Sequence, residues 1–498
     1  MDRATAIAGV QQAAQRALAL VRAGRYEQAL GWCVRGLTLA PKHPGLNFLA
    51  GVSHNAAGRP DAALGCFAKT LSEQPKHLDA LYNAGHALER LGRFEEAIAH
   101  YRRALAVQPD HLPSRFNLAN CLVALDTEDA RGEAKALLEQ ILSQQGEPRA
   151  HKNLGVIALS ENRLSDAQYH FARVLNTFPD LPETAGNLGF TLLKQEQFAE
   201  GWQYLERGSA TKEAEYRERR PALPLWDFSA GQRVLLWVEQ GIGDTLMFGS
   251  VLPEVIAASE AVGLACDPRL HPLLAATFGE ALTLFSVAGP DTLDGWAVQR
   301  SLESSMAGYR RSAADFAAAA QGYITADGAR AENLRAALGV GEEQTLIGVS
   351  WHSVASETGA SRSCALNDLL AAAAGDDRVF VNLQYGDVSD ELAQARDAGF
   401  SIIEAPDLDT REDLDGLATL VAACDLVVTV DNSTVHFGGV LGKNQILLLP
   451  YYCDWRWGLE RDTSLIYANT QLLRQPTAGD WAGVLAQLST LLATDHTR

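Results

Sequence analysis

The sequence predicts a helical solenoid followed by two Rossmann-like α/β lobes. Residues recur with a spacing of 34 through the first two-fifths of the chain, and that period is typical of stacked helix pairs. Two later series of short apolar runs, beginning at RVLLWVE and at TLIGVSW, alternate with helix-length segments, as in parallel sheets. We therefore expect a solenoid over residues 1–210, a linker over 211–232, and lobes over 233–340 and 341–498.

The 34-residue spacing is defined by small residues and by prolines. The positions that repeat are Gly24, Gly58 and Gly92, then Ala29, Ala63 and Ala97, then Pro41, Pro75 and Pro109. The clearest copy, LDALYNAGHALERLGRFEEAIAHYRRALAVQPDH at 78–111, resembles the tetratricopeptide repeat. Small residues let the two helices of a repeat pack closely, and the proline ends the second helix. We expect six repeats, of which the first and last are atypical caps.

Four asparagines occupy one position of successive repeats: Asn83, Asn117, Asn153 and Asn187. We expect them to line the inner groove of the solenoid from its first helices. A side-chain amide offers a donor and an acceptor, so such a ladder can bind an extended peptide through its main chain. The solenoid of O-GlcNAc transferase carries a similar ladder for its protein acceptors. The alternative is that asparagine is simply common at this repeat position.

Composition excludes several classes of protein. Lys and Arg total 42 against 61 Asp and Glu, and the net charge of −19 opposes binding to nucleic acid or to an anionic membrane. The seven cysteines are scattered and form no C-x-x-C, which argues against a disulfide framework and a zinc site. The sequence shows no secretory h-region and no apolar stretch long enough to span a bilayer. We expect a cytoplasmic protein without membrane insertion.

The first α/β series opens with LLWVEQGIGDTLMFGSVLP at 235–253, which predicts a strand, a glycine turn at Gly241 and Gly243, and a helix. Such a corner is where open α/β sheets bind ligands. Leu246 occupies the position of the third glycine of a dinucleotide fingerprint, which makes a nicotinamide or flavin site a weak interpretation, and the chain has no P-loop. Asp244, just after the turn, is either a helix cap or a functional carboxylate.

The second series has a comparable corner. The apolar run DLVVTV leads into DNSTVH, which places Asp431, Ser433, Thr434 and His436 at the start of a helix. Helix N-termini attract phosphate. Taken singly, the first three residues are equally suited to be helix caps and His436 to be a buried core histidine.

Five segments together carry a family resemblance: WVEQGIGDTLMFGSVLP, VNLQYGD, DLVVTVDNSTVHFGGVLGK, LLLPYYCDWRWG and LLRQPTAGDW. In this order, after tetratricopeptide repeats, they resemble the bacterial repeat-fused glycosyltransferases, including those that modify flagellin. The two lobes are similar to the ADP-heptose:lipopolysaccharide heptosyltransferases, which have the GT-B fold. The resemblance implies transfer of a sugar from a nucleotide-sugar donor to Ser or Thr hydroxyls of a protein, with flagellin the first expected acceptor.

The same resemblance implies roles for particular residues. Asp244 matches the general base that takes the proton of the acceptor hydroxyl. The donor would be bound by both corners and by the loops after TLIGVSWH and in NLQYGD, through Gly241, Gly243, Arg362, Gln384, Tyr385, Asp431, Ser433, Thr434 and His436. Trp455 and Trp457 are expected in the core or at the lobe interface. A GT-B enzyme implies neither a catalytic metal nor a cofactor.

Two other functions stay open at this point. One is a scaffold with inactive transferase lobes, although such a protein has no need of Asp244 or of the DNSTVH corner. The other is a lipopolysaccharide glycosyltransferase, against which the asparagine ladder and the lack of a basic amphipathic surface helix both count. UDP-N-acetylglucosamine, an ADP- or dTDP-sugar and a CMP-linked nonulosonic acid all put phosphate at the same corner, so the donor stays open, as do the stereochemical outcome and the oligomeric state.

Overall fold

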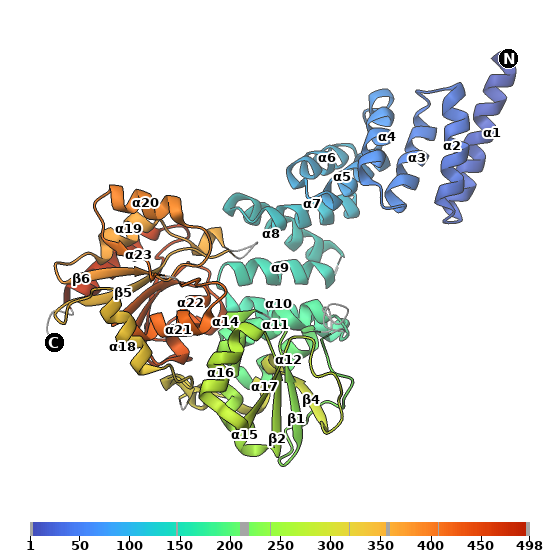
Figure 1. Ribbon diagram of the computed structural model, residues 1–498. Helices are drawn as coiled ribbons and strands as arrows, with labels where there is room; N and C mark the ends of the chain where they lie inside the picture. The colour runs from blue at the N-terminus through green and yellow to red at the C-terminus, as the bar shows by residue number, and fades with distance from the viewer. Residues whose placement is uncertain are drawn as a thin grey trace. The chain divides into compact units, whose positions relative to one another are not determined.

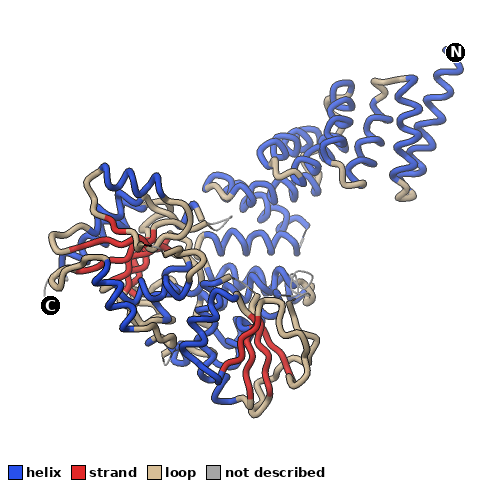
Figure 2. The backbone as a smooth tube through the Cα atoms, viewed as in Figure 1, coloured by secondary structure: helices blue, strands red, loops and turns tan. Residues whose placement is uncertain are grey.

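The computed structural model describes residues 3–145, 148–209, 219–239, 241–317, 319–354, 359–406 and 408–494. The chain divides into two compact units, Met1–Pro179 and Asp180–Arg498 (Figure 1). Figure 2 shows helices and loops in the first unit, whereas the second unit contains both helices and strands. Of the predicted linker, residues 211–218 lie outside the described part of the chain, as do residues 355–358 of the loop before Arg362.

The first unit consists of helix pairs. In chain order they are α1 (Arg3–Arg22) and α2 (Tyr26–Leu39), α3 (Pro44–Ala56) and α4 (Pro60–Glu73), α5 (Leu78–Arg90) and α6 (Phe94–Val107), α7 (Leu112–Leu125) and α8 (Glu128–Gln145), and α9 (Pro148–Ser160) and α10 (Leu164–Thr177). The two helices of each pair pack together, and the first helices of neighbouring pairs also contact each other. That arrangement is a solenoid of stacked repeats.

A glycine on the first helix of a repeat makes room for an aromatic ring on the second. A Cβ built on Gly85 would lie 2.7 Å from the ring of Tyr101, and one built on Gly155 would lie 2.6 Å from that of Phe171. Gly92 has a different task, since it turns the chain between two helices with φ of +71°, a left-handed conformation that disfavours other residues. The repeating residue types are therefore fixed by packing and by backbone geometry.

The last helix pair belongs to the second unit. Helices α11 (Pro182–Lys194) and α12 (Phe198–Gly208) continue the repeat pattern, which is why the sequence placed the boundary near residue 210. Packing places it after Pro179 instead. The Trp202 indole donates to the Arg310 carbonyl at 2.6 Å and meets the Trp455 ring edge-on at 5.1 Å. These contacts make the pair part of the α/β unit.

The first lobe is a four-stranded parallel sheet in the order β3-β2-β1-β4. Its strands are β1 (Arg233–Trp237), β2 (Ala261–Ala265), β3 (Leu282–Phe285) and β4 (Val298–Ser301), joined by helices α14 (Ile242–Phe248), α15 (Leu252–Ala258) and α16 (His271–Phe278) and followed by α17 (Leu302–Tyr309). Val234 and Leu236 of β1 are fully buried in the main core of the unit.

The second lobe is a six-stranded parallel sheet in the order β10-β9-β8-β5-β6-β7. Its strands are β5 (Thr345–Ser350), β6 (Arg378–Asn382), β7 (Ile402–Ile403), β8 (Leu426–Val430), β9 (Gln445–Leu449) and β10 (Thr470–Arg474); its helices are α18 (Gly328–Ala337), α19 (Leu366–Ala373), α20 (Ser389–Asp397), α21 (Leu414–Ala423), α22 (Ser433–Val440) and α23 (Trp481–Thr494). The strand order reverses between β5 and β8, and open α/β sheets bind ligands at such a point. The prediction of two Rossmann-like lobes after a solenoid is confirmed.

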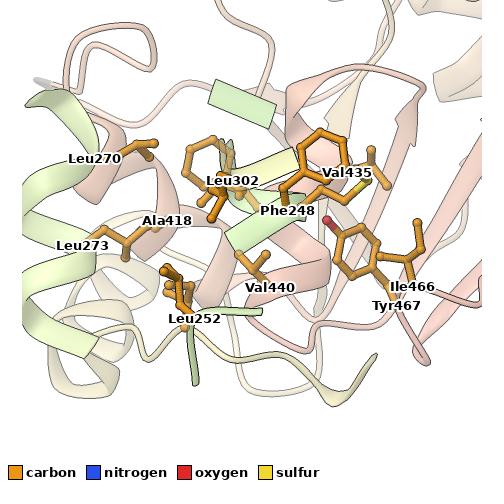
Figure 3. Close-up of a cluster of buried hydrophobic side chains, with 14 of the residues drawn as sticks. Phe248, Leu252, Leu270, Leu273, Leu302, Ala418, Val435, Val440, Ile466 and Tyr467 are labelled. Carbon is orange, nitrogen blue, oxygen red and sulfur yellow. The ribbon is translucent and has the colours of Figure 1, made fainter. Parts of the chain in front are cut away.

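The two lobes share one hydrophobic cluster (Figure 3). Phe248 and Leu252 of the first lobe are buried in the same cluster as Val435, Val440 and Tyr467 of the second. Helix α14, which follows the first predicted corner, packs against α22, which follows the second. Within the described residues, no helix combines the length and the apolar character that crossing a bilayer requires.

Candidate functional site

The first corner presents Asp244 toward the second lobe. Strand β1 ends at Trp237, and α14 begins with Gly241 as its N-cap, without a side-chain cap. Asp244 therefore lies in the first turn and is not the cap. Its side chain is 26% exposed, and its Oδ1 accepts a hydrogen bond from Nη2 of Arg456.

Arg456, which the sequence did not single out, lies after β9 in the short 3-10 helix Trp455–Trp457. Its Nη1 contacts Oδ2 of Asp454 at 2.9 Å, and its Nε donates to the thioether of Met247 at 3.0 Å. With Asp244 on Nη2, every nitrogen of the guanidinium has a partner. The side chain is 14% exposed, so Arg456 is a largely buried ion-pair bridge between the lobes.

The second corner is organised by Asn432, also missed from the sequence. Its Oδ1 accepts from the backbone N–H of Thr434 at 2.9 Å, which makes Asn432 the N-cap of α22. Its Nδ2 donates to the Ser350 hydroxyl at 2.7 Å and to the His352 carbonyl at 3.0 Å. One amide thus fixes the end of β8 against the end of β5, at the point where the strand order reverses.

Two residues predicted to contact the donor have their side chains engaged inside the lobe. The Thr434 side chain is fully buried, and its hydroxyl lies 3.3 Å from that of Ser350. The Gln384 side chain is 1% exposed, and its Oε1 accepts from the Ser350 hydroxyl and from the N–H groups of Trp351 and His352 at 2.9 to 3.0 Å. Both side chains are thus engaged within the lobe, and their contact with the donor stays a prediction.

Asp431 and Arg362 form an ion pair beside α22. Asp431 is 4% exposed, and its Oδ2 lies 3.2 Å from Nη1 of Arg362. Burial raises the pKa of Asp431, and the guanidinium of Arg362 opposes that shift. The structure brings these two predicted residues together, with Arg362 still partly accessible.

His436 is buried and neutral. Its Nδ1 lies 2.9 Å from the Tyr467 hydroxyl, and the Trp457 ring stacks on it at 5.9 Å. Burial lowers the pKa of His436 to about 3, and the charges of Arg456 and Arg362 act in the same direction. The imidazole therefore contributes hydrogen bonding and shape at neutral pH, without a positive charge.

A cavity of about 470 Å³ lies between the two lobes. Its lining includes Ile242, Gly243 and Arg269 from the first lobe and Tyr385, Gly386, Thr410, Arg411, Ser433 and Phe437 from the second. The structure thus brings Gly243, Tyr385 and half-buried Ser433 to one space, whereas exposed Gly241 lies outside this lining. Arg269 lies in the short 3-10 helix Pro268–Leu270 and Arg411 in a turn, and sequence reasoning missed both because neither belongs to a recognisable motif.

The predicted asparagine positions lie on first helices in both units. The Asn83 amide donates to the Asp79 carbonyl of its own helix at 2.7 Å. The Asn117 amide donates to the Tyr101 hydroxyl at 3.2 Å, and that of Asn153 donates to Oδ1 of Asn120. Asn187 lies on α11, in the second unit.

Comparison with known proteins agrees with the helical repeats. Two family models described as tetratricopeptide repeat match residues 48–111 and 88–155. Among solved structures, the pilus biogenesis factor PilW is 24% identical, with 42% of this chain and 94% of PilW covered and a TM-score of 0.35. YrrB, described as a TPR protein with an unusual peptide-binding site, is 21% identical, with 34% and 88% covered and a TM-score of 0.32.

The similarity to one curated relative extends beyond the repeats. Protein FlbA of Caulobacter vibrioides (strain ATCC 19089 / CIP 103742 / CB 15) is 29% identical over an alignment of 310 residues, which covers 57% of this chain and 51% of FlbA. The chain spans about half the length of that relative. The chain thus combines tetratricopeptide repeats with two parallel α/β lobes, and it is distantly similar to a part of FlbA.

Proposed function

We propose that this protein is a cytoplasmic, metal-independent glycosyltransferase with the GT-B fold. It transfers a sugar from a nucleotide-sugar donor to Ser or Thr hydroxyls of a protein, flagellin being the first candidate, and the repeats recruit that acceptor. The observation that carries the proposal is the cavity between the lobes, where α14 and α22 meet. Its volume of about 470 Å³ suits a ligand of nucleotide size.

The donor phosphate would bind at the N-terminus of α22. Ser433 begins that helix and lines the cavity, and Arg411 lines the same space. Backbone N–H groups at a helix start and arginine side chains are the groups that bind phosphate most often. They would also stabilise the charge that develops on the leaving nucleotide.

The acceptor hydroxyl would approach from the side of Asp244. As the bond from the acceptor oxygen to the anomeric carbon forms, the bond from that carbon to the donor phosphate oxygen breaks. The hydroxyl proton passes to the Asp244 carboxylate, and the electron pair of the broken bond leaves with the nucleotide. Asp244 is 26% exposed, which is enough for contact with a hydroxyl.

The test combines nucleotide binding with the mass of the acceptor. Calorimetry with UDP, ADP, dTDP and CMP should show binding of at least one nucleotide, and intact mass should show flagellin enlarged by one or more sugars after co-expression. Asp244→Asn should bind the nucleotide at least as tightly as the parent and lower transfer by about 10² to 10⁴.

The alternatives give different results. A scaffold would bind none of the four nucleotides and leave flagellin unchanged. A lipopolysaccharide glycosyltransferase would bind a nucleotide, leave flagellin unchanged and alter the mobility of lipopolysaccharide in a knockout strain. Either result contradicts the proposal.

A further inference from the structure

Arg456 sits between the two halves of the proposed reaction. Its Nη2 is bonded to Asp244, the proposed base, and its Nη1 to Asp454 at 2.9 Å. Its charge also acts on Asp431 and on His436, which belong to the corner proposed for the donor phosphate. The same guanidinium is therefore within electrostatic range of the acceptor side and of the donor side.

The pairing with Arg456 opposes the role proposed for Asp244. The Nη2 of Arg456 donates to the Oδ1 of Asp244 and forms an ion pair with it. The paired Oδ1 is occupied, so it does not face an incoming hydroxyl. One of the two oxygens of the proposed base is thus engaged by the ion pair with Arg456.

We infer that Arg456 is a positioning residue that releases Asp244 when the donor binds, so that the base becomes competent only in the donor complex. This inference rests on the proposed function. A donor phosphate would add negative charge beside Arg456, and a guanidinium binds phosphate at least as well as a carboxylate. Asp454 would keep Nη1 anchored while Nη2 changes partner, so the movement needed is a local rotation of one side chain.

The consequence is an order of binding. With the donor site empty, the acceptor hydroxyl meets an ion-paired carboxylate, and with the donor bound it meets a free one. Two carboxylates, Asp244 and Asp454, share Arg456 in the structure, and the donor phosphate would take the place of the first. Donor binding must then break the pair between Arg456 and Asp244, which weakens nucleotide affinity by the strength of that pair.

A double-mutant cycle on nucleotide affinity tests the inference in the full-length protein. The four proteins are the parent, Asp244→Asn, Arg456→Gln and the double variant, each titrated by calorimetry with the tightest binder among UDP, ADP, dTDP and CMP. Asp244→Asn should increase nucleotide affinity about fivefold in the parent, because donor binding no longer has to break the ion pair of Arg456. In the Arg456→Gln background, where that ion pair is already absent, the increase should be less than twofold. Simple repulsion between Asp244 and phosphate would give the same factor in both backgrounds, and that result would overturn the inference.

Two further outcomes are decisive. If none of the four nucleotides binds to the parent, the proposed donor site is wrong and the inference falls with it, whereas binding with equal factors defeats the inference alone. If Arg456→Gln does not fold, Arg456→Lys takes its place, since an ammonium keeps the charge but lacks the fork that holds both carboxylates. In the Arg456→Lys background, the gain in nucleotide affinity caused by Asp244→Asn should then be less than half the gain in the parent. An equal gain in both backgrounds would again contradict the release of Asp244.

Discussion

Gly243 of the first lobe lies directly against the His436 ring of the second. A Cβ built on Gly243 would stand 2.7 Å from Cδ2 of that ring and 3.4 Å from Cα of Ser433. The ring has no freedom to move away, since it is fixed by the Tyr467 hydroxyl and by the stacked Trp457. The absence of a side chain at Gly243 is thus what lets α14 approach α22.

Gly243→Ala should separate the two corners. We expect a loss of about 1 to 3 kcal/mol of stability, as for other overpacked sites, and nucleotide binding at least tenfold weaker. Gly241→Ala is the matched control, because nothing lies within 4 Å of a Cβ there and φ is −78°. Calorimetry and thermal unfolding measure both variants. Equal behaviour of the two would show that the close approach is unimportant.

His436 should make stability depend on pH in a defined direction. Its pKa is about 3 in the folded protein against about 6.5 unfolded, so its contribution is complete above pH 6.5 and is lost as pH falls toward 3. Between pH 7 and pH 5 the parent should lose about 2 kcal/mol through this residue. Burial raises the pKa of Asp431, so this residue favours the folded state as the pH falls, opposite to His436. The prediction therefore concerns the difference in stability between the parent and His436→Asn at each pH.

The measurement is urea unfolding followed by tryptophan fluorescence at several pH values. Trp32 is the one tryptophan of the first unit, so the signal reports mainly on the second. His436→Asn should flatten the dependence between pH 7 and pH 5. Parallel curves for parent and variant would mean that His436 is protonated with little cost in the folded protein.

Substitution of Arg411 tests whether the nucleotide of the donor binds in the cavity between the lobes. It is exposed and lines the cavity between the lobes, so Arg411→Gln should weaken nucleotide binding by about tenfold or more through loss of a charged hydrogen bond. Arg233→Gln is the control, since Arg233 begins β1 at the opposite end of the strand from the cavity. Unchanged affinity of Arg411→Gln would move the nucleotide away from this cavity.

The asparagine positions test recruitment. Replacing Asn83, Asn117, Asn153 and Asn187 together by Ala should weaken capture of flagellin in a pull-down by roughly 30-fold or more, since each amide contact contributes about 0.5 to 1.5 kcal/mol. A small loss of thermal stability is expected as well, because Asn117 donates to Tyr101. Exposed Asn176 of α10 supplies the control Asn176→Ala. Capture and modification of flagellin at the level of the parent would show that the four asparagines do not bind the acceptor and are simply common at this repeat position.

Truncation tests where the α/β unit begins. Residues 180–498 should fold and bind the same nucleotide within about twofold of the full chain, yet fail to modify the whole acceptor. Residues 215–498 should fold poorly, since they lack Trp202, and loss of such a buried ring costs about 3 to 5 kcal/mol. Glu196 would be lost too, with its ion pair to Arg461 at 2.5 and 2.7 Å. Solubility and calorimetry distinguish the two fragments, and equal behaviour would place the boundary after α12.

The parts of this structure that the sequence predicted are those determined by neighbours in the chain. The repeat period follows from contacts such as Gly85 with Tyr101, sixteen positions apart in one helix pair. Sheet strands follow from short apolar runs bounded by turns. The corners follow from a strand that runs into a glycine turn or a helix start, and Gly243 and Ser433 do line one cavity.

The features that the sequence did not predict depend on contacts between residues that lie far apart in the chain. Arg456 meets Asp244 across 212 positions, and nothing in DWRWG marks that pairing. Asn432 is the cap of α22 although its neighbours in DNSTVH are equally good cap residues, and its amide also donates to Ser350 and to the His352 carbonyl on the distant end of β5. The boundary after Pro179 has the same origin, since α11 and α12 look like any other repeat until their contacts are known.

The attachment of α11 and α12 to the α/β lobes leaves the five helix pairs before Pro179 as a separate unit. Whole 34-residue repeats can be gained, lost or exchanged before Pro179 without touching Trp202 or Glu196, the residues that anchor the last pair. An array of repeats from another protein, joined at that point, would meet a natural helical end with its packing intact. The last pair thus stays with the α/β lobes however many repeats precede it.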